Sequence, residues 1–329
     1  MLLLGLVWLI NISLGSVSIP FGEVLHGLFG QSLSKASWEH ILFHFRIPKS
    51  ITAISTGAGL SAVGLLMQTL FKNPMAGPAV LGISSGAGLG VALLVMGGSF
   101  FGWESLINNN LNTGTVLAAI IGAFIVLSFI LFLSSKIKNT LSILIIGLML
   151  SALTTAIIGI LSFFSKATQL QQYIFWGFGS LGHLSQTEIW FLSGIVVLGI
   201  IGILPLLKPL NGLLLGENYA KSTGVNLKRT KNYTLLISGL ITGIITAYVG
   251  PIAFIGLAVP HITRLIFNTS NHRILLPAVL FIGAIILLVC DTIAQLPMSE
   301  NVLPINAITS LFGAPLVIWL LIRQKKYHF

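Results

Sequence analysis

The sequence predicts an all-α polytopic membrane protein, and two observations lead to that prediction. The first is composition, because 55% of the 329 residues are hydrophobic and 7% are charged, whereas about a quarter of the residues in an ordinary globular domain are charged. The second is that the apolar residues form ten runs, most of which approach the ~20 residues that a helix needs to cross a bilayer. Barrel strands would be shorter and would alternate in polarity, so helices are predicted.

We expect each run to form one transmembrane helix, which gives ten transmembrane helices. The first run is the shortest, and no Lys or Arg precedes it, so it lacks the charged start of a signal peptide and is counted as a span. In chain order the runs cover residues 2–14, 47–71, 80–98, 116–134, 141–164, 189–207, 235–249, 252–267, 274–294 and 305–322.

The basic residues predict that both termini are cytoplasmic. With that orientation, 13 of the 17 Lys and Arg residues lie in cytoplasmic segments, as the positive-inside bias requires. The net charge of +10 therefore comes from basic residues in the segments that connect the apolar runs, and it does not indicate a nucleic-acid partner. The thirteen are Lys72, Lys136, Lys138, Lys208, Lys221, Lys228, Arg229, Lys231, Arg264, Arg273, Arg323, Lys325 and Lys326, which leaves Lys35, Arg46, Lys49 and Lys166 outside.

The whole chain, residues 1–329, is expected to be one transmembrane domain. The longest outer connection, residues 15–45, contains a helix-like piece at 21–29, and residues 169–182 form an aromatic-rich loop. Both segments are too small for an independent hydrophobic core. Cys290 is the single cysteine, so the chain cannot form an internal disulfide.

Residues 211–231 are the longest polar and strongly basic stretch, and they predict a short helix in the cytoplasm. Glu217 lies in its first turn, Lys221 follows four residues later, and Gly224 stands where a left-handed C-cap is needed. Ala220 and Gly224 would leave one side nearly bare, which suits docking into a cleft on another protein. The alternative is an ordinary solvated loop.

Several patterns imitate catalytic or nucleotide-binding motifs. Lys221 to Thr223 resemble the end of a Walker A loop, but the glycine before the lysine and the preceding strand are missing. Gly86 and Gly90, like Gly239 and Gly243, are four residues apart, which is the spacing of a helix contact between small residues. The seven histidines follow no metal-ligand pattern. No catalytic grouping is present, so the chain is not expected to be an enzyme, and no metal site is expected.

Asp291 is the one acidic residue within an apolar run. A charge in the bilayer costs about 2.5–3.5 kcal/mol on insertion scales, so an intramembrane carboxylate is a functional candidate. Asp291 lies close to the outer end of its run, and a hydrogen bond to a neighbouring helix is favoured over a proton relay.

Three stretches contain more than a plain span. RIPKS (46–50) places two cations one turn apart at an outer helix start, where they are expected to have a partner. FKNPMAGP (71–78) breaks the backbone at the inner surface, which is tolerated where the chain faces water or protein, as at a gate. AFIGLAVPHITR (253–264) places Pro260 inside a span, where it should produce a kink.

In this order and spacing, the stretches resemble FecCD-type permease subunits of ABC importers for iron-siderophores, haem and vitamin B12. The resemblance covers nearly the whole chain. Its motifs are RIPKS, MQTLFKNPMAGPAVLGISSGAGLG, GENYAKSTGVN, FIGLAVPHITRL, HRILLPA, CDTIAQ and LFGAPLVIWLL.

The resemblance implies ten helices per subunit, a homodimer, two cytoplasmic ATPase subunits, an external binding protein, and a location in the bacterial cytoplasmic membrane. ATP and magnesium would be bound by the ATPases, and this chain would hold no cofactor. Three groups of site residues follow by matching motifs: the coupling segment within 211–231 with Gly216, Glu217, Ala220, Lys221, Thr223 and Gly224; binding-protein docking at Arg46 and Lys49; and a cytoplasmic gate at Asn73, Met75, Thr140 and Leu141.

Three residues depart from the family pattern: Thr223, where leucine is common, Gln295, where vitamin B12 relatives have a basic residue, and Asn306, where glycine is frequent. The cargo expected is a siderophore, haem or a corrinoid, with vitamin B12 slightly less favoured because of Gln295. The alternative function is a secondary transporter or channel without ATPase subunits, which would need further intramembrane charges or half-helices.

Overall fold

The computed structural model describes residues 1–98, 111–137, 139–295 and 301–323, and the regular elements in these ranges are all helices. Lys138, Lys325 and Lys326, which contribute to the predicted orientation, lie outside the described residues. The α-helices are α1 (Leu2–Ser13), α2 (Phe21–Leu28), α3 (Ala36–Ile41), α4 (Ile47–Leu70), α5 (Ile83–Val95), α8 (Leu111–Lys136), α9 (Thr140–Phe164), α10 (Ala167–Gly177), α11 (Gln186–Ile203), α12 (Leu207–Leu214), α13 (Glu217–Ser222), α14 (Leu227–Val249), α15 (Ile255–Phe267), α16 (His272–Ala294) and α17 (Ile305–Arg323).

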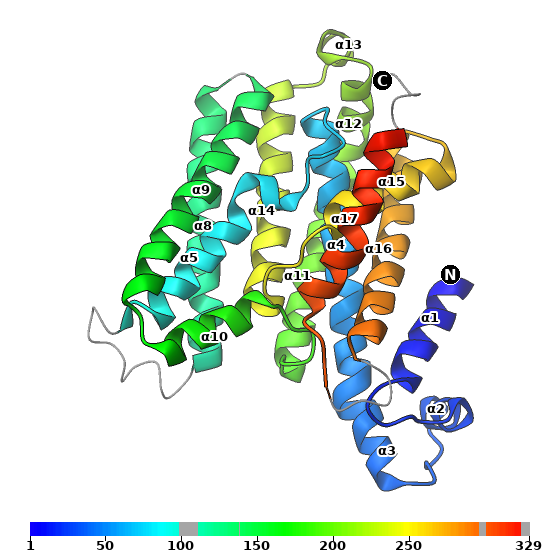
Figure 1. Cartoon of the computed structure of the whole chain (residues 1–329). Helices are drawn as coiled ribbons and strands as arrows, with labels where there is room; N and C mark the ends of the chain where they lie inside the picture. The colour runs from blue at the N-terminus through cyan, green and yellow to red at the C-terminus, as the bar shows by residue number, and fades with distance from the viewer. Residues whose placement is uncertain (99–110, 138, 296–300, 324–329) are drawn as a thin grey trace.

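Each of the ten apolar runs coincides with a helix, so the all-helical membrane fold is confirmed. Six helices are long and apolar enough to cross a membrane, whereas α1, α5, α15 and the apolar part of α17 are shorter. The count of ten spans therefore stays a prediction. In Figure 1 the long helices lie side by side, with α13 at the upper end and α2, α3 and α10 at the lower end.

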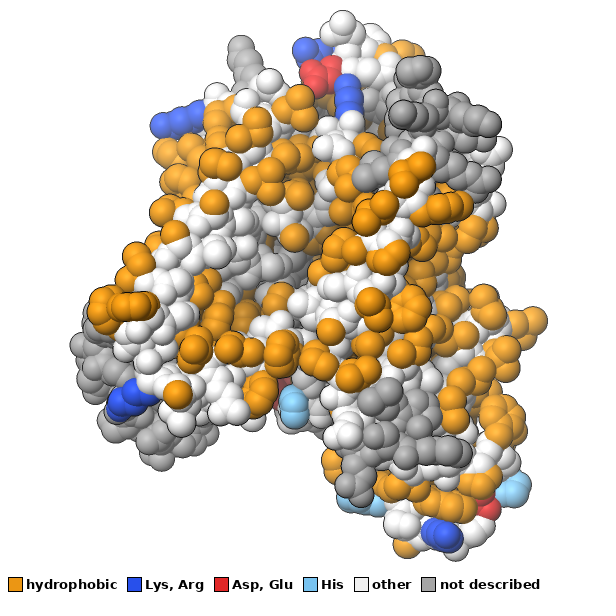
Figure 2. Space-filling view, viewed as in Figure 1, with side chains coloured by type: hydrophobic (Ala, Val, Ile, Leu, Met, Phe, Trp, Pro, Cys, Tyr) orange, Lys and Arg blue, Asp and Glu red, His pale blue; other side chains and the backbone are white. Residues whose placement is uncertain are grey.

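The surface is consistent with a bilayer around the middle of the molecule. In the view of Figure 2, hydrophobic side chains cover the middle, and the Lys and Arg side chains lie towards the upper and lower ends. Large apolar side chains are exposed on α8, α9 and α11, for example Phe124 at 59%, Met149 at 61% and Leu198 at 67%. Such an apolar surface would be unusual on a monomeric soluble protein.

Helix α4 forms the centre of the core, with 18 of its 24 residues buried. Pro48 lies in its first turn, as predicted. Glycines allow its neighbours to approach closely: a Cβ atom on Gly64 would lie 1.6 Å from the carbonyl oxygen of Gly256 in α15, and one on Gly57 would lie 2.3 Å from that of Gly283 in α16. Close backbone contact replaces the hydrophobic effect as the packing force between helices in lipid.

The predicted small-residue contacts are also confirmed. A Cβ atom on Gly90 would lie 2.0 Å from the carbonyl oxygen of Ala118 in α8, and Gly86 faces Gly122 of the same helix. Gly239 and Gly243 face Leu127 and Ala123, again in α8. Helices α5 and α14 therefore pack on α8 through glycine faces.

The prediction of a loop at residues 169–182 is wrong in its first half, because residues 167–177 form α10. Its polar and aromatic sequence, TQLQQYIFW, has no clear apolar stripe, so periodicity did not indicate a helix. Tyr173 and Trp176 stack with ring centroids 6.2 Å apart and lie close to Gly88 of α5. The helix predicted at 21–29 is confirmed as α2.

Candidate functional site: coupling helix, gate and outer cluster

The coupling segment contains the predicted short helix, α13, which is bounded by two glycines with positive φ. Gly216 precedes it with φ of 110°, and Gly224 follows it with φ of 82°. The backbone N–H of Gly224 donates to Lys221 at 3.0 Å, and that of Val225 donates to Ala220 at 3.0 Å. These two bonds form a Schellman C-cap, so the cap expected at Gly224 is confirmed.

The expectation of a bare docking face at Ala220 needs correction. Ala220 is fully buried and points towards Gly212 of α12, where a Cβ atom on the glycine would lie 3.7 Å from that of Ala220. Its small side chain thus lets α13 pack on α12 of the same chain. The exposed side of α13 carries Glu217, Tyr219 and Lys221.

A chain of polar contacts connects α12 to the inner end of α4. Oδ1 of Asn211 in α12 accepts from the backbone N–H of His272 at 2.9 Å and lies 2.7 Å from its Nδ1. An amide oxygen only accepts, so Nδ1 carries the proton and Nε2 is an acceptor. The hydroxyl of Thr69, one residue before the end of α4, lies 2.8 Å from Nε2. Helices α12 and α4 therefore contact the same buried histidine.

A second polar contact ties α4 to α15. The side chain of Gln68 donates to the carbonyl oxygen of Leu257 at 3.0 Å and accepts a hydrogen bond from Arg264. Arg264 is one of the thirteen predicted cytoplasmic cations, and its side chain is partly buried here. The inner end of α4 is thus held by α15, α16 and, through His272, α12.

The predicted gate residues lie on two segments whose contact is formed by other residues, Val80 and Gly147. After α4 ends, Lys72 adopts φ of 48° and Asn73 accepts the N–H of Met75 at 2.9 Å, which turns the chain away from the helix axis. Thr140 and Leu141 begin α9, where Asn139 caps the N–H of Leu141 at 2.9 Å. The two segments touch deeper in the fold, since a Cβ atom on Gly147 of α9 would lie 2.2 Å from the carbonyl oxygen of Val80.

The outer basic pair has partners within the chain. Arg46 is 7% exposed and donates to the carbonyl oxygens of Ile12 at 2.9 Å and Ser13 at 2.7 Å, and also to that of Val17. It therefore satisfies carbonyls at the C-terminal end of α1. In this conformation its guanidinium is buried against the end of α1, and docking at Arg46 stays a prediction.

Lys49 forms an ion pair with Asp291, whose Oδ1 atom lies 2.9 Å from the ammonium nitrogen. Asp291 is 1% exposed, and its Oδ2 atom accepts from Asn11 at 3.0 Å and from Gln295 at 2.7 Å. Asp291 is thus the partner of Lys49, and it bonds to neighbouring helices as predicted. This outer cluster of Lys49, Asp291, Asn11 and Gln295 joins α1, α4 and α16. Docking at Lys49 stays a prediction.

Sequence reasoning did not single out Asn11 or Asn211. Both are polar residues beside or inside apolar stretches. A buried amide needs hydrogen-bond partners, so this position in the sequence could have indicated that each of them contacts another helix. His272 was not singled out either, and its side chain lies between Asn211 and Thr69.

Comparison with known proteins places these features in a family. The model of the FecCD transport family matches residues 3–323. The chain is 34% identical to the vitamin B12 import system permease protein BtuC of Klebsiella pneumoniae, with 98% of this chain and 92% of that protein covered. It is also 34% identical to the hemin transport system permease protein HmuU of Yersinia pestis, over 99% of this chain and 95% of that protein.

Solved structures agree with the sequence relatives. An inward-facing conformation of a metal-chelate type ABC transporter matches with a TM-score of 0.83 and 29% identity, covering 98% of this chain and 97% of that chain. PsaBC of Streptococcus pneumoniae shares the fold, with a TM-score of 0.57 and 19% identity, over 91% of this chain and 95% of that one. The chain belongs to the FecCD transport family.

Proposed function

We propose that this chain is the membrane subunit of an ATP-binding-cassette importer that moves an iron-siderophore, haem or a corrinoid into the cytoplasm. The observation that carries the proposal is the combination of family membership with an exposed, capped α13 that packs on α12, which is in turn connected through His272 to α4. A permease needs such a connection if hydrolysis on a separate subunit is to move its helices.

The proposed assembly has ten transmembrane helices per subunit, with both termini cytoplasmic, in the bacterial cytoplasmic membrane. Two copies of this chain, two ATPase subunits that bind ATP and magnesium, and an external binding protein complete it. Support comes from the relatives, two of which are import permeases for vitamin B12 and hemin, and from the ten apolar helices. The charge bias supports the orientation that places α13 in the cytoplasm.

In the proposed mechanism, the ATPases bind the exposed side of α13, which carries Glu217 and Lys221, and the C-cap residue Thr223 that follows it. A displacement of α13 passes to α12 through the Ala220 contact, and then through Asn211 and His272 to the inner end of α4. The segment after α4 contains Asn73 and Met75, so the movement reaches the proposed gate, to which Thr140 and Leu141 also belong. Such a transfer requires contacts that differ between two states.

The alternative, a carrier without ATPases, loses its main candidate residue. Asp291 was the one intramembrane acid available for ion coupling, and it is paired with Lys49 and two amides.

Co-purification tests the proposal. The chain, expressed with candidate ATPase subunits of the same organism, should retain one of them in detergent, and Glu217→Lys should weaken that retention. A chain that retains no ATPase, yet transports the cargo in vesicles, would refute the proposal. Binding assays of the external binding protein against haem, corrinoids and ferric chelates would then identify the cargo.

A further inference from the structure

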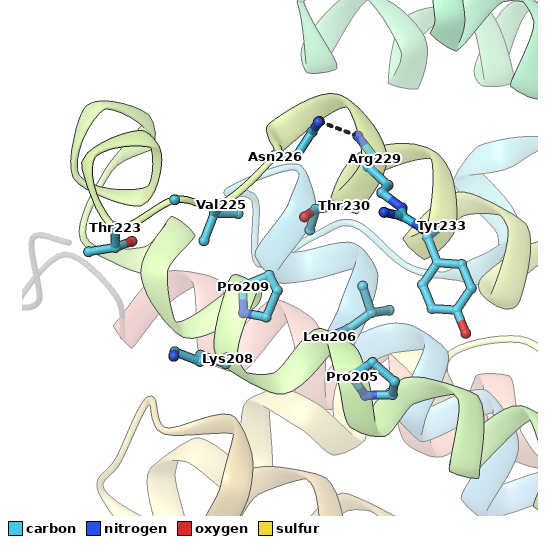
Figure 3. Close-up of a pocket in the computed structure, with 11 residues that line it drawn as sticks. Pro205, Leu206, Lys208, Pro209, Thr223, Val225, Asn226, Arg229, Thr230 and Tyr233 are labelled. Carbon is cyan, nitrogen blue, oxygen red and sulfur yellow. Dashed lines mark hydrogen bonds between the residues drawn. The ribbon is translucent and has the colours of Figure 1, made fainter.

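A pocket of about 590 Å³ lies beside the coupling segment. Figure 3 shows that it is formed by three parts of the chain: the turn between α11 and α12 together with α12, the connection after α13, and the first turns of α14. Its lining residues are Pro205, Leu206, Lys208, Pro209, Thr223, Gly224, Val225, Asn226, Arg229, Thr230 and Tyr233.

The pocket is basic. Lys208 and Arg229 line it from different helices, and none of its lining residues is acidic. Within the described ranges, neither cationic side chain has a recorded hydrogen bond or ion pair; the contact drawn to Arg229 in Figure 3 is made by its backbone N–H. Two unpaired cations at one pocket favour an anionic ligand.

Thr230 adds a hydroxyl to the lining of the pocket. The residue is 7% exposed, but its hydroxyl oxygen is not one of the buried, unpaired side-chain oxygens of the described residues, so it is open to the pocket and free to donate there. Thr230 also lies in the first turn of α14, where the helix dipole favours negative charge. The pocket thus offers one neutral donor between two cationic ones.

Apolar groups complete the lining and continue away from it. Pro205, Leu206, Pro209, Val225 and the ring of Tyr233 form the remaining wall. From Pro205 an exposed apolar stripe runs back along α11 towards the middle of the membrane zone, made of Leu204, Ile201, Leu198, Val197 and Trp190, each more than half exposed. A ligand with a phosphate at one end and a hydrocarbon chain at the other matches both surfaces.

We propose that this pocket binds the headgroup of an anionic phospholipid of the inner leaflet. Arg229 and Thr230 hold the phosphate, Lys208 adds a second positive charge on the other side of the pocket, and the acyl chains lie along the exposed stripe of α11. A free phosphate or an acidic side chain of a protein partner would use the cations but not the apolar stripe. The inference uses the orientation proposed above, which places this end of the molecule at the cytoplasmic surface.

The position of the pocket gives the lipid a role. Thr223 and Gly224, at the C-terminal end of α13, belong to the lining. A bound headgroup therefore contacts the coupling segment, α12 and α14 at once and stabilises their relative position. Because of this contact, the coupling of ATP hydrolysis to transport would depend on lipid composition.

Native mass spectrometry of the purified chain tests the proposal, with phosphatidylglycerol, phosphatidylcholine and inorganic phosphate as probes. We expect one phosphatidylglycerol per chain to be retained in preference to phosphatidylcholine. In Lys208→Gln and Arg229→Gln its affinity should fall by roughly fivefold for each charge removed. Arg273→Gln is the matched control, because Arg273 is exposed at the same end but does not line the pocket, and its affinity should be unchanged.

Four results would overturn the lipid assignment. The first is equal retention of phosphatidylglycerol and phosphatidylcholine, and the second is an equal loss in the Arg273→Gln control. The third is displacement of the lipid by millimolar inorganic phosphate, which would show that the apolar stripe contributes nothing. If the variants instead lose the ATPase subunit and keep the lipid, the cations serve the protein partner and the proposal fails. None of these readouts requires transport, so they are independent of the proposed cargo and mechanism.

Discussion

Oδ1 of Asn211 lies 2.7 Å from Nδ1 of His272, and this one oxygen also accepts the histidine backbone N–H at 2.9 Å. Asn211 is in α12, which carries α13, and His272 is the first residue of α16 and contacts Thr69 near the end of α4. The pair therefore connects the proposed ATPase contact to the segment that leads into the proposed gate.

We predict that Asn211→Leu uncouples hydrolysis from transport. The substitution removes the acceptor for two donors of His272, and each unsatisfied buried group costs about 1–3 kcal/mol. ATP hydrolysis by the reconstituted complex should persist, while uptake into proteoliposomes should fall by at least about tenfold. Asn112→Leu, an exposed asparagine on α8, is the control. Unimpaired uptake in Asn211→Leu would remove this pair from the mechanism.

The outer cluster predicts a large loss of stability for Lys49→Met. This change leaves Asp291 buried without its ammonium partner, and breaking a buried pair on one side costs about 3–5 kcal/mol. The double variant Lys49→Met with Asp291→Leu should recover much of the loss, because no charge is left uncompensated. Thermal unfolding in detergent gives the comparison. Equal stability of the single variant and the wild type would mean that the ion pair is not formed.

Packing of α5 on α8 predicts a contrast between two glycines. A Cβ atom on Gly90 would lie 2.0 Å from the carbonyl oxygen of Ala118, whereas nothing lies within 4 Å of a Cβ on Gly159 in α9. Gly90→Val should therefore destabilise the chain by roughly 1–3 kcal/mol through overpacking, and Gly159→Val should change it little. Similar melting temperatures for the two variants would contradict this helix contact.

Gly224 allows the proposed ATPase contact to be separated from backbone strain. A residue with a side chain would be strained at its φ of 82°. No atom lies within 4 Å of a Cβ there, however, so a larger side chain would not clash with the rest of this chain. Gly224→Leu should release the ATPase subunit, as measured by co-purification. Gly30→Leu is the control, because Gly30 has φ of 75° and equally open surroundings near the opposite end. Equal ATPase retention in both variants would argue against the contact.

The sequence predicted the helical elements well, because each apolar run is longer than the uncertainty of its edges. The helix cap at Gly224 and the glycine contacts of Gly86 and Gly239 were also predicted, since both follow from spacing along one helix. Ala220 was placed on the wrong side, because a six-residue helix has too few residues to define a buried face. Its burial against Gly212 depends on how the chain folds back between α12 and α13, which a pattern within α13 does not show.

Contacts between distant segments could not be predicted from one sequence. Arg46 donates to carbonyl oxygens of α1, and Lys49 pairs with Asp291, which lies more than two hundred positions further along the chain. Docking of a binding protein at these two residues was predicted from motif matching, and it stays a prediction. The contacts from Asn211 through His272 to Thr69 likewise join segments that are far apart in the sequence. A pattern along the chain indicates which residues are polar in an apolar setting, but only the fold indicates their partners.

ATP-driven uptake in reconstituted vesicles tests the central claim most directly. The chain is reconstituted with its ATPase and loaded binding protein, and cargo entry is measured with ATP, without ATP, and without the ATPase under a proton gradient. The account predicts uptake only when both ATP and the ATPase are present. Uptake at an unchanged rate without the ATPase, driven by the proton gradient, would contradict it.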